Sequence, residues 1–210
     1  MRTRVKICGF TSVDEAVYAA HLGVDAIGLV FYAPSSRNVE IDQAIKIVAA
    51  LPAFTSVVAL FVDEQESRIR EVLAQVNIDC LQFHGDESPE ACRIYGKRYI
   101  KAVSMKAGID IAALSQYYHD ASGLLLDAYH PDEKGGTGSQ FDWALIPQSC
   151  TLPIILAGGL EAANAIQAIQ TVKPYALDVS SGVEVKKGIK DSLKMAAFIK
   201  QVNESDKATT

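Results

Sequence analysis

The sequence predicts an α/β protein with a single-domain (β/α)8 TIM barrel over residues 1–204. Short apolar segments recur along the chain, and each is followed by a polar turn and then by a helical hydrophobic pattern. Eight such units share 210 residues, about 26 residues each, which suits the smaller barrels. Strands that are apolar on both faces and separated by helices are expected to run parallel, and closure removes their exposed edges.

An open doubly wound sheet is the alternative to a closed barrel. Such a sheet more often carries a G-x-G-x-x-G fingerprint after its first strand, and none follows Cys8. The chain ends in a short polar segment, and we expect residues 205–210 to form a flexible tail.

The first half of the chain supplies four strand–helix units. Ser12 and Glu15 form a capping-box pattern before the first helix, and Gly23 and Pro52 end the first two helices. The expected strands are Val5–Cys8, Ala26–Phe31, Thr55–Val62 and Asp79–His84. The expected helices are Val13–Leu22, Ile41–Leu51, a segment with Ile69, Val72, Leu73 and Val76 on one face, and Pro89–Tyr95.

The second half repeats the pattern around a long polar loop, Ala128–Gln140. The last helix is expected to bury Ile189, Leu193 and Ala196 on one face. The expected strands are Arg98–Val103, Gly123–Asp127, Pro153–Ala157 and Tyr175–Val179. The expected helices are Asp110–Tyr118, a short helix opening at Phe141–Trp143, Glu161–Gln170 and Ile189–Val202.

Composition narrows the range of partners and compartments. The formal net charge is −5 and no basic run occurs, so we expect no nucleic-acid partner. No apolar run approaches the ~20 residues that span a bilayer, and the N-terminus lacks the apolar region of a signal peptide. The four cysteines show no zinc-like spacing, which favours free thiols in the cytoplasm and no metal site.

The functional face of such a barrel is the rim at the carboxyl ends of its strands. The rim is expected to combine a thiol, two carboxylic acids, a guanidinium, an imidazole and two glycine turns. Reading off the strand ends gathers Cys8, Arg37, Asp63, His84, Asp127, Gly158–Gly159 and Ser180–Gly182.

Two glycine turns follow the seventh and eighth expected strands, at Gly158–Gly159 and Ser181–Gly182. Backbone N–H groups in this position commonly bind phosphate. A single glycine pair more often only eases a tight turn. Turns after both strands favour a small phosphorylated substrate.

A carboxylic acid and a thiol are the candidate proton-transfer groups. Asp127 closes the apolar run Leu124–Leu126, and the next helix starts too far away for Asp127 to cap it. A partly desolvated carboxyl has a raised pKa and can act as a general acid. Cys8 is by default a small buried hydrophobe, and it needs positive potential nearby to act as a base.

Lys6 shares strand parity with Cys8 and should lie one layer deeper in the barrel. Because the eighth strand neighbours the first on closure, we expect Lys6 to pair with Asp178 beneath the site. We also expect Lys6 to lower the pKa of Cys8.

Other polar residues of the rim allow two interpretations each. His84 shares parity with Gln82 and is interpreted as a hydrogen-bonded residue, because no second metal ligand stands at suitable spacing. Arg37 is by default solvated, but its loop could aim it at a substrate carboxylate. The loop Lys134–Gly138 is either a flexible connection or a segment that closes over ligand.

Six motifs stand in order on the expected strands and loops: Lys6–Thr11, Gln82–Gly85, Leu126–Ala128, Gly135–Gly138 with Phe141–Trp143, Leu156–Leu160 and Asp178–Glu184. Together they resemble the phosphoribosylanthranilate isomerase family over nearly the whole chain, from residue 5 to about residue 194. One departure is Ser36, where the family often has proline, so the loop before Arg37 is expected to be less rigid.

The resemblance implies an enzyme of tryptophan biosynthesis. Its reaction would be the Amadori rearrangement of N-(5-phosphoribosyl)anthranilate into 1-(2-carboxyphenylamino)-1-deoxyribulose 5-phosphate, without cofactor or metal. It implies Asp127 as the general acid that opens the sugar ring and Cys8 as the general base that takes the C2 proton. The implied substrate-binding residues are Arg37, Gln82, His84, Gly136, Gly158, Gly159, Ser181 and Gly182, with Lys6 and Asp178 in support.

Three other functions are compatible with a phosphate-binding barrel. An indole-glycerol-phosphate synthase should carry lysines on interior strands, and Ala26–Val30 and Val57–Val62 have none. A ribulose-phosphate epimerase should show histidine and acid metal ligands, which are missing. A non-catalytic phosphosugar-binding protein would not need Cys8 and Asp127. Monomer and homodimer are equally compatible with the sequence.

Overall fold

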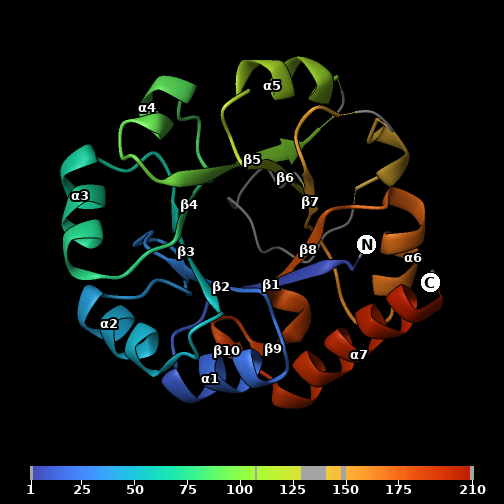
Figure 1. Cartoon of the computed structure of the whole chain (residues 1–210), viewed down its shortest axis with the longest axis horizontal. Coiled ribbons are helices and arrows are strands. Elements are labelled where there is room, and N and C mark those ends of the chain that lie inside the picture. The colour runs from blue at the N-terminus through green and yellow to red at the C-terminus, as the bar shows by residue number, and fades with distance from the viewer. Residues whose placement is uncertain (1, 107, 129–140, 148–149, 209–210) are drawn as a thin grey trace.

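The computed structural model describes residues 2–106, 108–128, 141–147 and 150–208. Within these residues the strands β1 to β8 form a closed barrel in sequence order, with parallel neighbours throughout. β1 pairs with β8 to close it, with Lys6 opposite Asp178. Figure 1 looks down the barrel, with the strands inside and the helices around them. The predicted fold class is confirmed.

The elements follow the expected alternation. The barrel strands are β1 Arg4–Cys8, β2 Ala26–Val30, β3 Ser56–Phe61, β4 Cys80–Phe83, β5 Arg98–Met105, β6 Gly123–Ala128, β7 Ile154–Leu156 and β8 Ala176–Val179. The helices are α1 Val13–His21, α2 Ile41–Ala50, α3 Glu66–Gln75, α4 Pro89–Arg93, α5 Ile111–Tyr117, α6 Ala165–Val172 and α7 Ser192–Ala208, with 3-10 turns η1 Trp143–Leu145 and η2 Ser181–Val183.

Local side-chain hydrogen bonds cap the starts of some helices, whereas the N-cap residues of α1, α2, α3 and α6 make no such bond. The hydroxyl of Ser88 accepts from the Ala91 N–H at α4, and Asp110 accepts from the Ala113 N–H at α5. The capping box expected at α1 is wrong. Ser12 holds the N-cap position, but its hydroxyl makes no capping bond, and the Glu15 carboxylate accepts from the backbone N–H of Lys190.

The hydrophobic core has two layers. The larger layer lies between the barrel and its helices and includes Ile7, Phe61, Leu81 and Phe198. Inside the barrel the alternate side chains form a smaller cluster: Ile100, Ala102, Leu125, Ile155, Ala157 and Ala176. Burial of one such large apolar side chain contributes about 1.5–3 kcal/mol. Both faces of the barrel strands therefore stabilise the fold and hold the rim in place.

The C-terminal region differs from its prediction. Glu184–Lys186 and Ile189–Lys190 form an antiparallel hairpin, β9–β10, where the last helix was expected to begin. Ile189 and Leu193 are 40% and 78% exposed, so they are not on the inner face of that helix. α7 instead buries Met195, Phe198, Ile199 and Val202.

α7 also continues to Ala208, into the segment expected to be a tail. Ser205 is buried there, and the Asp206 carboxylate accepts from both the N–H and the hydroxyl of Thr3. These bonds tie the end of the last helix to the residues before β1, and the two ends of the chain lie on the same side of Figure 1.

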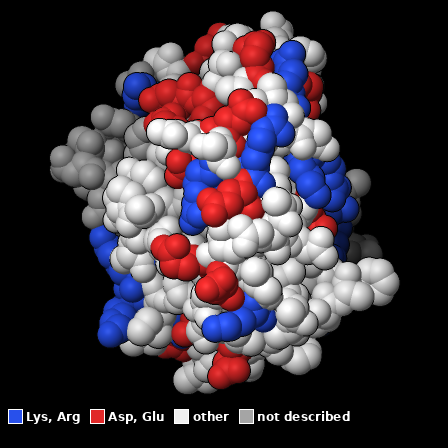
Figure 2. All heavy atoms as spheres, turned by 90° about the vertical axis from the view of Figure 1, so that its left-hand side faces the viewer, with Lys and Arg blue, Asp and Glu red and all other residues white. Residues whose placement is uncertain are grey.

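The face that carries α3 shows acidic and basic side chains interspersed (Figure 2). Several are paired along the helix, including Arg70 with Glu66 and Arg68 with Glu71. Such exposed pairs stabilise a helix by only a few tenths of a kcal/mol, about 0.2–0.5 each. Among the described residues, no helix combines the length and apolarity needed to cross a membrane.

Candidate active site

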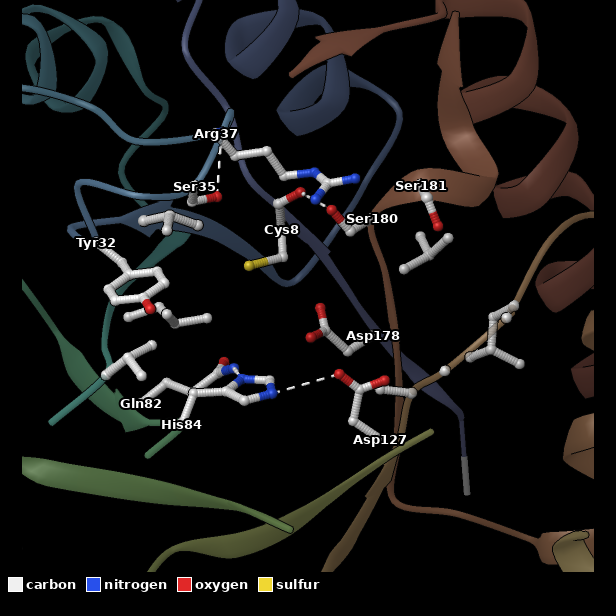
Figure 3. Close-up of a pocket in the computed structure, with 18 residues that line it drawn as sticks. Cys8, Tyr32, Ser35, Arg37, Gln82, His84, Asp127, Asp178, Ser180 and Ser181 are labelled. Carbon is white, nitrogen blue, oxygen red and sulfur yellow. Dashed lines mark hydrogen bonds and ion pairs between the residues drawn. The ribbon is translucent and has the colours of Figure 1, made fainter. Parts of the chain in front are cut away.

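A pocket opens at the carboxyl ends of the barrel strands, where the rim residues were expected. Cys8, Arg37, His84 and Asp127 line it together with Gly158–Gly159. The other lining residues are Val30, Tyr32, Ser35, Leu60, Val62, Gln82, Ala157, Leu160, Asp178, Val179, Ser180 and Ser181. Figure 3 shows Arg37 over Cys8 at one end of the pocket, with His84 and Asp127 at the other.

Asp127 is buried near the end of β6 and faces the pocket. Its Oδ1 accepts from the Ala128 N–H at 2.9 Å. Gly158 packs directly against these two residues, and a Cβ at that position would lie 2.5 Å from the Ala128 nitrogen. Gly158 also has a φ of 79°, which side chains rarely adopt. The glycine therefore lets the β7 turn approach the acid closely.

His84 connects Asp127 to the floor of the pocket. Its Nδ1 lies 3.1 Å from the side-chain nitrogen of buried Gln82. Because an amide nitrogen can only donate, Nδ1 accepts, and in the neutral ring Nε2 carries the proton. Nε2 lies 3.3 Å from Asp127 Oδ2, within ion-pair distance but without the alignment of a hydrogen bond. The ring thus presents its N–H side to the acid.

Cys8 ends β1 and is buried beside Lys6 and Asp178. The Lys6 ammonium donates to both oxygens of Asp178 at 2.9 Å, so the expected pairing is confirmed. Burial raises the pKa of the Cys8 thiol. Lys6 opposes this effect without overcoming it, and Asp178 adds to it. Lys6 thus lowers the pKa of the thiol, as expected, but the net pKa still lies above its ordinary value, because desolvation of the thiolate is the larger effect.

Arg37 is buried at the edge of the pocket, not solvated. Its Nε and Nη2 each donate to the Glu184 carboxylate at 2.8 Å. Its side chain lies across Gly9, where a Cβ would come within 2.5 Å of the Arg37 Cδ. The backbone N–H of Arg37 donates to the hydroxyl of Ser35 at 3.1 Å, so hydrogen bonds shape the loop that lacks the family's proline.

The glycine turns after β7 and β8 meet at the pocket. Gly158, Gly159 and Ser181 line it, and Ser181 opens η2. Gly182 lies behind the lining, where it packs against the carbonyl of Leu160. Gly136 and the rest of the loop 134–138 lie outside the described residues. The two turns that the sequence placed on different strands thus come together in one part of the rim.

Some residues of the site region were not predicted, and one predicted rim residue serves elsewhere. Glu184 on β9 accepts from Arg37, and Lys190 on β10 donates to Glu184. The only sequence signal for Glu184 was its place at the end of the motif that begins at Asp178. Asp63 does not reach the pocket, because its carboxylate accepts from the Asp86 N–H at 2.6 Å and braces the β3 and β4 loops.

The fold and the pocket together define a (β/α)8-barrel enzyme with a thiol, a carboxylic acid and an imidazole at the carboxyl rim. A family model described as N-(5'phosphoribosyl)anthranilate (PRA) isomerase matches residues 5–201. The chain belongs to this family. The N-(5'-phosphoribosyl)anthranilate isomerase of Nitrosococcus oceani is 53% identical over 203 residues, which cover 97% of this chain and 98% of the relative.

Solved structures agree with this assignment. The phosphoribosyl anthranilate isomerase of Thermotoga maritima superposes with a TM-score of 0.88 at 36% identity, covering 96% of this chain and 99% of the relative. A phosphoribosyl anthranilate isomerase in complex with reduced 1-(o-carboxyphenylamino)-1-deoxyribulose 5-phosphate gives a TM-score of 0.85 at 35% identity, with the same coverage.

Proposed function

We propose that Asp127 and Cys8 are the general acid and the general base of this isomerase, which acts in tryptophan biosynthesis. The observation that carries the proposal is that both side chains line one pocket. They reach it from β6 and β1, which β7 and β8 separate around the barrel. A substrate in the pocket can therefore meet an acid on one side and a base on the other.

The first step is opening of the sugar ring. Asp127 protonates the ring oxygen of N-(5'-phosphoribosyl)anthranilate, the bond between that oxygen and C1 breaks, and the anilino nitrogen donates its electron pair to form a Schiff base. The His84 ring, whose Nε2 lies 3.3 Å from Asp127 Oδ2, supports Asp127 from the floor of the pocket. The substrate binds over the Asp127 oxygens, and its arrival excludes water from the acid.

The second step moves a proton from carbon. The Cys8 thiolate takes the C2 proton, and the electron pair of the C–H bond moves toward the Schiff-base nitrogen to give an enolamine. Tautomerisation of the enolamine yields the keto product, 1-(2-carboxyphenylamino)-1-deoxyribulose 5-phosphate. Because burial raises the pKa of the thiol, the base form is a minor species in the free enzyme at neutral pH, and Lys6 and Lys190 stabilise it.

Substrate binding uses the two ends of the pocket. Arg37 holds the anthranilate carboxylate, since its guanidinium borders the pocket above Cys8 (Figure 3). The turns at Gly158–Gly159 and Ser181 hold the phosphate through backbone N–H groups, with Gly182 setting their approach. Gln82 and His84 contact the sugar, and Gly136 stays a predicted substrate-binding residue. A relative has been solved in complex with reduced 1-(o-carboxyphenylamino)-1-deoxyribulose 5-phosphate, a ligand that carries both a phosphate and a carboxylate.

The test is turnover of N-(5'-phosphoribosyl)anthranilate, followed by loss of its anthranilate fluorescence. Asp127→Asn and Cys8→Ala should each lower kcat by at least about 100-fold, the usual contribution of a positioned acid or base. Asp42→Asn on α2 and Cys150→Ala are matched controls away from the pocket and should retain normal rates. Normal rates in both site variants would exclude these roles.

Location and assembly complete the proposal. We propose that the chain works in the cytoplasm, where its four free cysteines stay reduced. A structure of the Thermotoga maritima enzyme is described as mutually generated monomers of a dimeric phosphoribosylanthranilate isomerase. For this chain monomer and homodimer both remain predictions, and light scattering of the purified protein decides between them.

A further inference from the structure

The β9–β10 hairpin packs directly against the loop that carries Arg37. Figure 1 shows the hairpin beside α1, outside the barrel. The hydroxyl of Thr11 donates to the carbonyl of Gly188 at 3.0 Å. Gly188 has a φ of 84°, and a Cβ there would lie 2.6 Å from the carbonyl oxygen of Ser36. The hairpin therefore touches the residue immediately before Arg37.

Two residues of the hairpin join Arg37 in a buried charge cluster. Glu184 accepts from Arg37 at two atoms and from the Lys190 ammonium at 2.7 Å. The side chains of Arg37, Glu184 and Lys190 are 8%, 3% and 0% exposed. Burial of charges costs several kcal/mol per ion, and such a cluster often contributes less stability than apolar side chains of equal volume. Its two cations and one carboxylate lie where an anionic substrate group is expected.

The cluster restricts an otherwise flexible side chain. An arginine side chain loses about 2 kcal/mol of rotamer entropy when it is fixed in one conformation. Here the aliphatic part of the Arg37 side chain lies against Gly9. The Glu184 carboxylate fixes the guanidinium by accepting hydrogen bonds from its Nε and Nη2. Glu184 does not line the pocket, so it acts on Arg37 and not on the substrate.

Lys190 extends the same arrangement to the backbone beside the base. Its ammonium donates to the Ser180 carbonyl at 3.2 Å, and the Ser180 hydroxyl donates to the Cys8 carbonyl at 2.9 Å. The hairpin thereby connects the guanidinium at the rim with the end of β1.

We propose that Glu184 and Lys190 are positioning residues that hold the Arg37 guanidinium in the orientation that binds the substrate carboxylate. The inference rests on the proposed role of Arg37. The conformational entropy of the Arg37 side chain is lost during folding, so less of it remains to be lost when substrate binds. The hairpin is then a determinant of specificity for substrates that carry a carboxylate on the aromatic ring.

Two ligands separate this role from a general structural one. The first is reduced 1-(o-carboxyphenylamino)-1-deoxyribulose 5-phosphate, and the second is the same compound without the ring carboxylate. Dissociation constants are measured by calorimetry. Glu184→Gln should weaken binding of the first ligand by about tenfold or more and change binding of the second by less than about twofold. Glu71→Gln removes a carboxylate of equal size from an exposed pair and should change neither.

The outcomes distinguish the two proposals. If Arg37→Met weakens only the carboxylate ligand while Glu184→Gln affects both ligands equally or neither, the positioning role is wrong and the Arg37 role stands. If Arg37→Met does not distinguish the ligands, the Arg37 role itself fails. Should Glu184→Gln not fold, Gly188→Ala keeps every charge, places a methyl group against the Ser36 carbonyl, and is judged by the same criterion.

Discussion

Cys8 is subject to opposing influences, and their balance sets how much thiolate is present. Burial raises its pKa, Lys6 and Lys190 lower it, and Asp178 raises it further. The Lys6–Asp178 pair is thus a pair of opposite charges on one side of the thiol. Because the proposed base must be deprotonated while the proposed acid, Asp127, stays protonated, the pKa of Cys8 should appear as an alkaline limb in the pH dependence of kcat/KM.

Removing the positive charge of the pair should move this alkaline limb one way, and removing the negative charge should move it the other way. Lys6→Met removes a positive charge, raises the pKa of Cys8 and shifts the limb to higher pH. Asp178→Asn removes a negative charge and shifts the limb to lower pH. The measurement is the pH dependence of kcat/KM at a temperature where circular dichroism shows each variant folded.

A second buried pair supplies the control for this experiment. Lys101 on β5 is paired with Glu87 at 2.9 Å, and it is not among the charges that act on Cys8. Lys101→Met breaks a pair of the same kind, at a comparable stability cost of about 3–5 kcal/mol, and should leave the limb in place. A shift of both Lys6→Met and Asp178→Asn in one direction would contradict the account.

Single residues differ in how far the sequence predicts them. The Lys6–Asp178 contact follows from strand parity and closure, because both are fixed by the repeating pattern. The Arg37–Glu184 contact spans 147 positions between a loop and a hairpin, and neither segment has a period that sets its register. The net pKa of Cys8 depends on burial, which no local pattern of residues reveals.

At the scale of elements, regular periodicity predicted the barrel strands and most helices, and the hairpin was the main error. Ile189, Leu193 and Ala196 match a helical period, but two of them are exposed. The signal that was available is Gly188 between β9 and β10, whose positive φ suits a tight turn. The two strands of the hairpin are too short to show a clear alternation of apolar and polar residues, so the helical pattern of the neighbouring segment dominated the prediction.

The extension of α7 leads to a stability prediction. Asp206→Ala removes the acceptor of two Thr3 hydrogen bonds in a partly buried site, and should lower the free energy of unfolding by about 1–3 kcal/mol. Glu204→Ala, on the same helix, removes an exposed pair with Lys200 and a long exposed hydrogen bond from Gln201, and should cost about 0.5 kcal/mol or less. Urea unfolding measures both. Equal, negligible effects would mean that the last turn of α7 does not brace the start of β1.

At the scale of the whole molecule, closure of the barrel brings the chemistry together. Residues from positions 8 to 181 reach one pocket because parallel strands present all their carboxyl ends on the same rim. The interior cluster below fills the barrel, so the pocket has a packed floor. A carboxylic acid from β6, a thiol from β1 and the glycine turns after β7 and β8 then face a common space.

The most direct test of this arrangement is a crystal structure of the chain with reduced 1-(o-carboxyphenylamino)-1-deoxyribulose 5-phosphate. We predict the phosphate against Gly158–Gly159 and Ser181, and the ring carboxylate on Arg37. Asp127 should lie within about 2.6–3.2 Å of the oxygen derived from the sugar ring, and the Cys8 sulfur should face C2. A ligand bound with its phosphate at Arg37, or with C2 turned away from Cys8, would contradict the assignment of acid and base.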